Sequence, residues 1–356
     1  MNSSLNTRRS PNHIEPHQIG NVRRKVEVFV PAWWLPGAHA QTLWGKLGPR
    51  RPLPTGYLKR LETPDRDFLE IFRVAGEPGM PRLVVLHGLE GSLDSHYARG
   101  ISNRVASAGW GVDFMLFRGC GTEPNHAPRF YHSGETSDLD FVIHRLGDEF
   151  PRAPLVLVGY SLGGNVLLKW LGERRGDLPP SVQAAAAVSV PYDLAAGARF
   201  ISCGFSRIYE RYFLRTLKLK AARKLREFPG LFDMQALDRA DTIVAFDDAV
   251  TAPVHGFGSA DDYYTKSSSI HFLPKIRLPT LLLSAFDDPF LPPEVLARVA
   301  RVAAVNSALT TDFPSHGGHV GFVTGNIPGA PRYWSEERVT GFLTSHVARL
   351  GSAPGG

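Results

Sequence analysis

The feature that most constrains this chain is the segment at residues 159–163, Gly-Tyr-Ser-Leu-Gly, which has the pattern G-x-S-x-G. It directly follows the apolar run at residues 155–158 and opens a helical stretch at residues 163–171. A strand, a sharp turn and a helix in this order form a nucleophile elbow, which projects the serine hydroxyl at the carboxyl edge of a sheet. Ser161 is therefore the candidate nucleophile, and the sequence holds no second G-x-S-x-G.

The rest of the chain supplies the alternation that such an elbow needs. Strands are expected at residues 83–86, 110–117, 155–158, 184–190, 280–284 and 308–313, and helices at 95–108, 133–148 and 163–171. Strands that alternate with helices predict an α/β fold with a mostly parallel central sheet flanked by helices. Residues 57–61 and 68–72 are expected to pair as an antiparallel hairpin that leads into this sheet.

One long segment, residues 191–278, breaks the alternation and is interpreted as a helical insertion between two strands. It contains an apolar stripe at helical spacing, and it also holds many basic residues between 207 and 226. A helix that packs its stripe on the sheet and leaves its charges in water explains this pattern. The alternative is a basic face that contacts anionic membrane lipid. The aromatic residues expected to line a cavity wall or to pack inside the insertion are Phe205, Phe257, Tyr263 and Tyr264.

A serine hydroxyl needs a base, which an acid in turn orients, and in this fold the order along the chain is serine, acid, histidine. His319, in a glycine-flanked loop after the last predicted strand, is the favoured base, and His316 is its rival. The loop after residues 280–284 offers Asp287 and Asp288 as the acid. Asp288 is favoured because it stands just before a short apolar stretch that ends at a proline.

Two backbone amides are expected to form the oxyanion hole. One is the amide of Leu162, which follows the nucleophile, and the other is that of Leu89 in the loop after residues 83–86. His87, which opens this loop, is expected to have a structural hydrogen-bonding role.

The composition excludes several classes of protein. The net charge of +6 is mild for 356 residues, and no nucleic-acid-binding motif is present, so no nucleic-acid partner is expected. No metal motif and no phosphate-binding or dinucleotide-binding glycine loop occurs, so we expect no metal and no cofactor. Two cysteines, Cys120 and Cys203, fit free thiols in the cytoplasm. Residues 1–25 are polar, lack the apolar core of a secretion signal, and are expected to form a disordered basic tail.

The chain also resembles a known family, the YheT-like branch of the α/β-hydrolases, over about residues 29–343. The segments that carry the resemblance, in chain order, are 39–43 (HAQTL), 87–92 (HGLEGS), 118–121 (RGCG), 131–134 (YHSG), 159–165 (GYSLGGN), 287–290 (DDPF) and 317–322 (GGHVGF). The resemblance places the family's serine on Ser161, its acid on the pair Asp287–Asp288 and its histidine on His319. It implies an α/β-hydrolase domain at residues 26–190 and 279–350, with residues 191–278 as a cap or lid.

The resemblance further implies a serine carboxylic-ester hydrolase that acts on small-molecule esters, either short- to medium-chain fatty acyl esters or acylglycerols. An alcohol acyltransferase or a phospholipase with the same triad is the alternative, although the H-x-x-x-x-D box of some acyltransferases is absent. A ligand-binding protein without activity is disfavoured because serine, acid and histidine are all present. Peripheral contact with an anionic membrane is a further expectation, whereas the oligomeric state is left open.

Overall fold

Eight strands form one sheet in the computed structural model, which describes residues 28–347. Their order across the sheet is β1-β2-β4-β3-β5-β6-β7-β8. The strands are β1 (Tyr57–Glu62), β2 (Phe68–Val74), β3 (Arg82–Leu86), β4 (Gly111–Leu116), β5 (Leu155–Tyr160), β6 (Val182–Val188), β7 (Thr280–Leu283) and β8 (Leu309–Asp312). From β4 to β8 the neighbours pair in parallel, while β2 pairs antiparallel with both β1 and β4. The mostly parallel sheet and the hairpin predicted from the sequence are therefore confirmed. The predicted tail at residues 1–25 lies outside the described residues.

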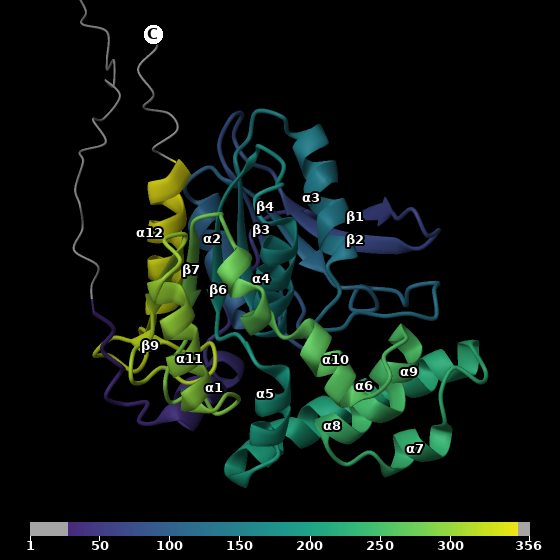
Figure 1. Cartoon of the computed structure of the whole chain (residues 1–356). Coiled ribbons are helices and arrows are strands. Elements are labelled where there is room, and N and C mark those ends of the chain that lie inside the picture. The colour runs from purple at the N-terminus through teal and green to yellow at the C-terminus, as the bar shows by residue number, and fades with distance from the viewer. Residues whose placement is uncertain (1–27, 348–356) are drawn as a thin grey trace, which may run out of the picture.

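Helices cover both faces of this sheet (Figure 1). The helices that flank it are α2 (His96–Ala106), α3 (Ser137–Glu149), α4 (Leu162–Arg174), α11 (Pro293–Ala304) and α12 (Trp334–Val347). Successive strand residues point to opposite faces, so in β3 Leu83 and Val85 pack with α2 and α12, whereas Val84 and Leu86 pack with α3, α4 and α11. Both faces are consequently buried, which explains why the parallel strands read as uninterrupted apolar runs.

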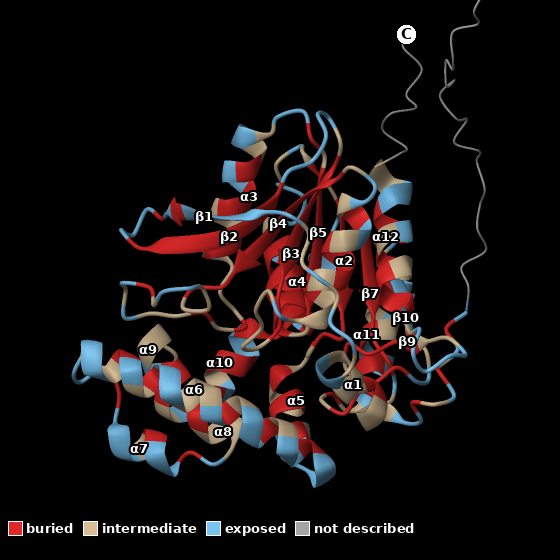
Figure 2. Cartoon of the chain, turned by 180° about the vertical axis from the view of Figure 1, so that it is seen from behind, coloured by how far each residue is buried: buried red, intermediate tan, exposed pale blue. Residues whose placement is uncertain are grey.

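Residues between β6 and β7 form the helical insertion, and in the view of Figure 1 they lie below the sheet. Its α-helices are α5 (Leu194–Ile201), α6 (Arg207–Glu227), α7 (Met234–Arg239), α8 (Ile243–Phe246), α9 (Ala252–His255) and α10 (Ala260–Ser267). A π-helical segment at Asp247–Thr251 joins α8 to α9. Figure 2 shows the contrast in burial, because the central strands are buried while the insertion helices expose much of their outer surface.

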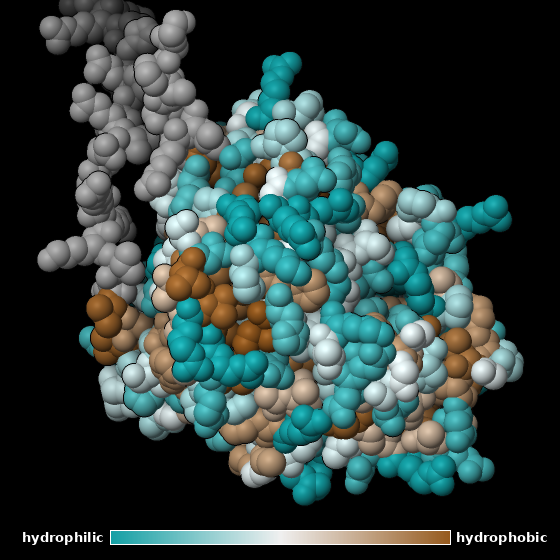
Figure 3. All heavy atoms as spheres, in the orientation of Figure 1, coloured by the Kyte–Doolittle hydropathy of each residue, from teal (hydrophilic) through white to brown (hydrophobic). Residues whose placement is uncertain are grey.

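Helices α11 and α12 were not predicted from the sequence, and neither were two further elements near the ends of the fold. Helix α1 (Ala38–Leu47) precedes the sheet, and a two-stranded ribbon of β9 (Val323–Thr324) and β10 (Arg332–Tyr333) precedes α12. Hydrophilic and apolar side chains alternate over the face seen in Figure 3, where the apolar ones gather in small patches. Within residues 28–347, no helix combines the length and apolar character needed to cross a bilayer.

Candidate active site

Ser161 lies at the turn between β5 and α4, with backbone φ 51° and ψ −121°. A positive φ is unfavourable for serine, and this strained geometry is typical of a nucleophile elbow. The flanking glycines are required by close contacts. A Cβ atom at Gly159 would lie 2.5 Å from the carbonyl oxygen of Gly163, and one at Gly163 would lie 2.4 Å from that of His87. The local sequence therefore folds into the sharp turn that its pattern predicts.

An aspartate and a histidine from two later loops lie at the same edge of the sheet. His319 follows β8, and its Nδ1 lies 2.9 Å from Oδ2 and 3.1 Å from Oδ1 of Asp288, which follows β7. When Nδ1 donates its proton to the carboxylate, Nε2 is left as the acceptor of the neutral imidazole. Phe290 packs against the imidazole, with ring centroids 4.1 Å apart.

The two alternative residues, Asp287 and His316, pair with each other outside the cavity that contains Ser161. The side chain of His316 is 64% exposed, and its Nδ1 is 3.3 Å from Oδ2 of Asp287. The other oxygen of Asp287 accepts a hydrogen bond from the backbone amide of Gly318, at 2.9 Å. Neither Asp287 nor His316 lines the cavity that contains Ser161, whereas Asp288 and His319 both do. The geometry therefore favours the pair Asp288–His319, and it gives Asp287 a role in shaping the histidine loop.

Helix α1 holds this loop in place, a role that the sequence pattern did not assign. The hydroxyl of Thr42 accepts a hydrogen bond from the backbone amide of His319, at 2.9 Å. The buried side chain of Gln41 accepts one from the amide of Val323, at 2.7 Å, and donates to the carbonyl oxygen of the same residue. A Cβ atom at Gly318 would lie 2.4 Å from the carbonyl oxygen of Ala38, so helix and loop are in close contact. Residues 39–43, which carried the family resemblance without a function, thus position the candidate base.

The second predicted amide, that of Leu89, belongs to a loop that two tyrosines fix. The hydroxyl of Tyr97 accepts a hydrogen bond from the amide of Gly88, and the hydroxyl of Tyr131 accepts one from the amide of Glu90, both at 2.9 Å. The amide of Leu89, between them, has no partner among the described residues. The amide of Leu162, at the N-terminus of α4, is unpartnered within residues 28–347 as well. The loop that holds Leu89 runs close to the nucleophile, since a Cβ atom at Gly88 would lie 3.1 Å from the Cβ of Ser161. Two amides that are unpartnered among the residues described, those of Leu89 and Leu162, therefore belong to the two segments that meet at Ser161.

His87 anchors the start of this loop. Its Nε2 accepts a hydrogen bond from the amide of Phe117, at 3.1 Å, so its Nδ1 carries the proton and donates to the carbonyl oxygen of Gly88, at 2.7 Å. Burial lowers the pKa of His87 to about 4, so the ring is neutral at pH 7. This arrangement matches the structural hydrogen-bonding role expected from the sequence.

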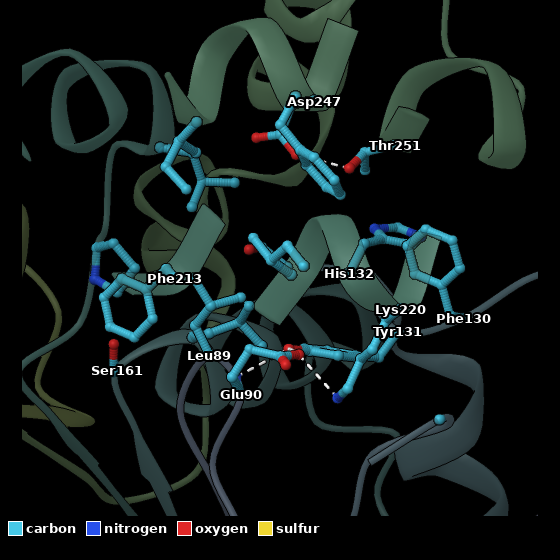
Figure 4. Close-up of a pocket in the computed structure, with 18 of the residues that line it drawn as sticks. Leu89, Glu90, Phe130, Tyr131, His132, Ser161, Phe213, Lys220, Asp247 and Thr251 are labelled. Atoms are coloured by element: carbon cyan, nitrogen blue, oxygen red, sulfur yellow. Dashed lines mark hydrogen bonds and ion pairs between the residues drawn. The ribbon is translucent and has the colours of Figure 1, made fainter. Parts of the chain in front are cut away.

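A cavity of about 350 Å³ opens in front of Ser161, between the sheet and the helical insertion. Its lining is mostly apolar, and Figure 4 shows Ser161 at one end, with Phe130 and His132 at the other. Asp247 and Thr251 of the π-helical segment lie on the side opposite Glu90. Burial raises the pKa of the Asp247 carboxyl to about 6, although hydrogen bonds from Thr251 and Tyr264 oppose this effect.

The aromatic residues expected at this wall divide into two groups. Tyr263 and Tyr264 line the cavity, whereas Phe205 and Phe257 do not. Phe205 is 49% exposed and packs on His39 of α1, and Phe257 packs on Tyr263 from behind. Of the two roles left open by the sequence, Tyr263 and Tyr264 therefore line the cavity wall, Phe257 packs inside the insertion, and Phe205 has neither role. In the described part of the chain, no group of three or more His, Cys, Asp or Glu side chains is arranged to hold a metal ion.

Comparison with known proteins identifies the family. The model of the alpha/beta hydrolase fold family matches residues 81–326. YheT of Escherichia coli (strain K12) is 41% identical over 324 residues, which cover 90% of this chain and 94% of that protein. Phospholipase ABHD3 of Mus musculus is 30% identical over 70% of this chain and 60% of its own length. The monoacylglycerol lipase of Saccharomyces cerevisiae is 29% identical over 82% of this chain and 65% of its own length.

Solved structures agree on the fold. An esterase of Pyrococcus furiosus, Pf2001, superposes with a TM-score of 0.55 at 17% identity, over 84% of this chain and 97% of its own. The acylaminoacyl peptidase of Pyrococcus horikoshii reaches a TM-score of 0.54 at 15% identity, over 88% of this chain and 44% of its own. One fold thus supports both esterase and peptidase chemistry, so the reaction must be argued from the site. The chain belongs to the α/β-hydrolase family and, within it, to the YheT-like branch, as an esterase- or lipase-type hydrolase.

Proposed function

We propose that this protein is a serine carboxylic-ester hydrolase that works through an acyl-enzyme on Ser161, His319 and Asp288. The observation that carries the proposal is the meeting of three separate loops at one cavity. These loops bring the strained serine of the elbow, the histidine and its hydrogen-bonded aspartate together. No hydrogen bond joins Ser161 Oγ to the imidazole within residues 28–347, and catalytic contacts of this kind often form only when substrate is bound.

In the proposed reaction, Ser161 Oγ attacks the ester carbonyl carbon while Nε2 of His319 takes the hydroxyl proton. Asp288 holds the imidazole in the correct tautomer and stabilises the imidazolium. The amides of Leu89 and Leu162 donate to the oxyanion of the tetrahedral intermediate. His319 then protonates the leaving alcohol, and water repeats the sequence to release the acid and restore Ser161.

The cavity supports short- to medium-chain acyl esters or acylglycerols as the substrate class. Ligand pockets of small molecules typically enclose about 300–1,000 Å³, so this one stands near the lower limit. Its apolar wall, to which Phe213 and Leu217 of α6 contribute, suits an acyl chain. The names of two relatives, a phospholipase and a monoacylglycerol lipase, are consistent with acyl esters of glycerol.

The proposal is tested with p-nitrophenyl esters from acetate to palmitate and with a fluorophosphonate probe. The wild-type protein should hydrolyse the shorter esters and label covalently. The variant Ser161→Ala should lose both properties, and unchanged turnover would refute the assignment. Adding an alcohol and measuring the ratio of new ester to free acid distinguishes hydrolysis from acyl transfer, because both reactions use the same acyl-enzyme.

We also propose that the outer face of α6 contacts an anionic membrane surface, where lipid esters would be met. Ile208, Tyr212 and Leu219 are each more than half exposed and lie on one side of the helix. Beside them, three exposed arginines form no hydrogen bond or ion pair with any described residue; they are Arg207, Arg211 and Arg215. Exposed apolar side chains flanked by arginines are typical of helices that lie at a membrane surface.

Flotation with anionic phosphatidylserine-containing vesicles at low salt tests this contact. Wild-type protein should float with the vesicles, and the double variant Arg207→Glu, Arg211→Glu should not. Failure of the wild-type protein to float would reject membrane contact and would leave the ester-hydrolase proposal unaffected, because that reaction is measured on soluble esters.

A further inference from the structure

Glu90, the residue after the candidate oxyanion donor Leu89, has a strained backbone. Its φ is 54°, in the left-handed region that few residues other than glycine adopt. Such strain persists only where neighbouring groups fix it, and it is common beside reactive sites. The orientation of the Leu89 amide depends on this turn, so the contacts that hold Glu90 also set the direction of the Leu89 N–H.

The side chain of Glu90 is held from two sides. Its side chain is 7% exposed, and Oε1 accepts a hydrogen bond from the hydroxyl of Tyr131, at 2.8 Å. The same hydroxyl accepts a hydrogen bond from the backbone amide of Glu90. Tyr131 therefore binds both the main chain and the side chain of Glu90. The second partner of Oε1 is the ammonium group of Lys220, at 2.9 Å. Figure 4 shows these three side chains together on one wall of the cavity.

Lys220 comes from α6, in the helical insertion, 130 residues further along the chain. It also donates to the thiol of Cys120, at 3.3 Å. Burial raises the pKa of Cys120 to about 11, which keeps the thiol neutral at pH 7. Glu90 is therefore the anionic partner of this lysine. Burial by itself would lower the pKa of Lys220, but the neighbouring Cys120 and Glu90 outweigh it and raise that pKa, so the ammonium form is maintained.

We propose that Glu90 and Lys220 are positioning residues for the oxyanion hole. Their ion pair joins the helical insertion to the strained loop and holds the Leu89 N–H in the direction of the developing oxyanion. The oxyanion hole is then complete only when α6 is seated against the loop. This inference rests on the proposed ester-hydrolase function and adds a role for the insertion in the chemical step, beyond enclosing the acyl chain.

A positioning role predicts a loss in kcat with little change in KM. In the full-length protein, Lys220→Met should lower kcat for p-nitrophenyl acetate by roughly tenfold or more, less than the 10²–10³-fold lost when an oxyanion donor is removed outright. Lys220→Arg should recover most of the activity because it keeps the charge. Glu90→Gln should cost about as much as Lys220→Met, and the double variant should cost little more than either one, since both changes remove one interaction.

Two lysines on the same helix are matched controls. Lys218 donates to the carbonyl oxygen of Asp238 inside the insertion, at 2.9 Å. Lys224 donates to the carbonyl oxygen of Asn125, at 2.5 Å, so it also anchors the insertion but does not touch the oxyanion loop. Lys218→Met and Lys224→Met should leave kcat for the acetate ester near the wild-type value. A loss in Lys224→Met equal to that in Lys220→Met would overturn the proposal, because general seating of the insertion would then explain both.

Inhibitors report the oxyanion hole directly. The serine oxygen adds to the carbonyl carbon of a trifluoromethyl ketone, and the bound tetrahedral adduct carries an oxyanion. The matching methyl ketone binds mainly as a neutral carbonyl. Lys220→Met should weaken binding of the trifluoromethyl ketone by the same factor by which it lowers kcat/KM. Binding of the methyl ketone should stay unchanged. Equal weakening of both inhibitors would show that the lysine acts only in ground-state binding, which contradicts the proposal.

Hydrogen exchange tests the pair without any need for activity. Backbone amides of residues 88–91 should exchange faster in Lys220→Met than in the wild-type protein or in Lys218→Met. Unchanged exchange in all three proteins would overturn the proposal. If the wild-type protein neither hydrolyses esters nor reacts with a fluorophosphonate, the ester-hydrolase function fails by that result alone, and the exchange experiment still decides whether Lys220 orders the loop.

Discussion

The sheet and the helical insertion bury their side chains in different ways. All residues of β3, β4 and β5 are buried, and the apolar side chains on the two faces of the sheet form two extensive clusters. In the 21-residue helix α6, by contrast, only Glu210, Leu214, Ala221 and Lys224 are buried. The insertion packs around two smaller clusters of its own.

Many of the contacts between the sheet domain and the helical insertion are hydrogen bonds. Asn165, on the elbow helix α4, donates to the carbonyl oxygens of Ser133 and Ser267 and accepts from the amide of Ser269. The hydroxyl of Tyr263 accepts from the amide of Ser133, and that of Ser206 donates to the carbonyl oxygen of Pro289. The sheet thus fixes the candidate catalytic groups through a large apolar core, whereas the insertion is placed by individual directional bonds. Substitutions in the sheet should therefore affect chemistry and global stability, whereas those in the insertion, apart from the Lys220 that pairs with Glu90, should mainly affect selectivity.

The largest difference is expected at the two neighbouring aspartates of the loop after β7. Asp288→Asn should lower kcat by about 10⁴-fold, because an amide favours the wrong tautomer of His319, as it does in other serine hydrolase triads. Asp287→Asn should cost far less, since within residues 28–347 the side chain of Asp287 pairs only with His316 and the amide of Gly318. Steady-state kinetics with p-nitrophenyl acetate measures both. A larger loss of kcat in Asp287→Asn than in Asp288→Asn would identify Asp287 as the acid of the triad.

A matched pair of leucines compares the two cores directly. Leu157→Ala in β5, at a fully buried position, should lower the free energy of unfolding by about 2–5 kcal/mol through lost burial and a cavity. Leu214→Ala in α6 removes the same atoms, but among partly buried neighbours that can close around the gap, so its cost should be smaller. Urea unfolding of both variants provides the comparison. Equal losses would mean that the insertion shares the rigidity of the sheet.

Selectivity for the acyl chain should depend on α6. Phe213 lines the cavity, so Phe213→Ala should raise KM for p-nitrophenyl octanoate by roughly 10–150-fold, which corresponds to about 1.5–3 kcal/mol, the contribution from burial of one large apolar side chain. The acetate ester, which is too short to use this wall, should be hydrolysed at nearly the wild-type rate. Tyr212→Ala, at the adjacent exposed position, is the control and should change neither value. Similar changes for both esters would argue against an acyl site at Phe213.

The smallest effect concerns the pH dependence of stability in the insertion. The pKa of Asp247 is raised to about 6 from the ordinary 3.8, so the folded state keeps a proton that the unfolded chain has already lost. The protonated carboxyl of Asp247 therefore contributes to the free energy of unfolding in full below about pH 4, and this contribution is lost as the pH rises towards 6. Urea unfolding at several pH values between 4 and 7 should therefore show a flatter profile for Asp247→Asn than for the wild type. Asp241→Asn, at an exposed position of the same insertion, should follow the wild-type profile, and three parallel profiles would contradict this account.

Much of the hydrolase fold could be predicted from local patterns. Buried parallel strands are uninterrupted apolar runs, so every strand from β3 to β8 was expected within a few residues of its observed bounds. Helices α1, α11 and α12 and the ribbon of β9 and β10 were not expected; the ribbon strands are very short, and α1 is fixed by contacts with the histidine loop. The cavity wall was predicted only in part, since the sequence pattern left open which of the aromatic residues line the cavity and which pack against other elements, such as Phe205 on His39 and Phe257 on Tyr263.

The sequence by itself determined the elbow around Ser161, the α/β class and the chain order of serine, acid and histidine, because these features depend on spacing and on short-range geometry. The sequence already favoured Asp288 over Asp287 and His319 over His316, and the tertiary structure adds a geometric reason, because Asp288 and His319 line the cavity with Ser161 whereas Asp287 and His316 do not. Only the tertiary structure brought Lys220 to Glu90 across 130 residues. A pairing of this kind leaves no local pattern, because a charged residue on a helix looks the same in sequence whether or not it reaches a loop that is distant in the chain.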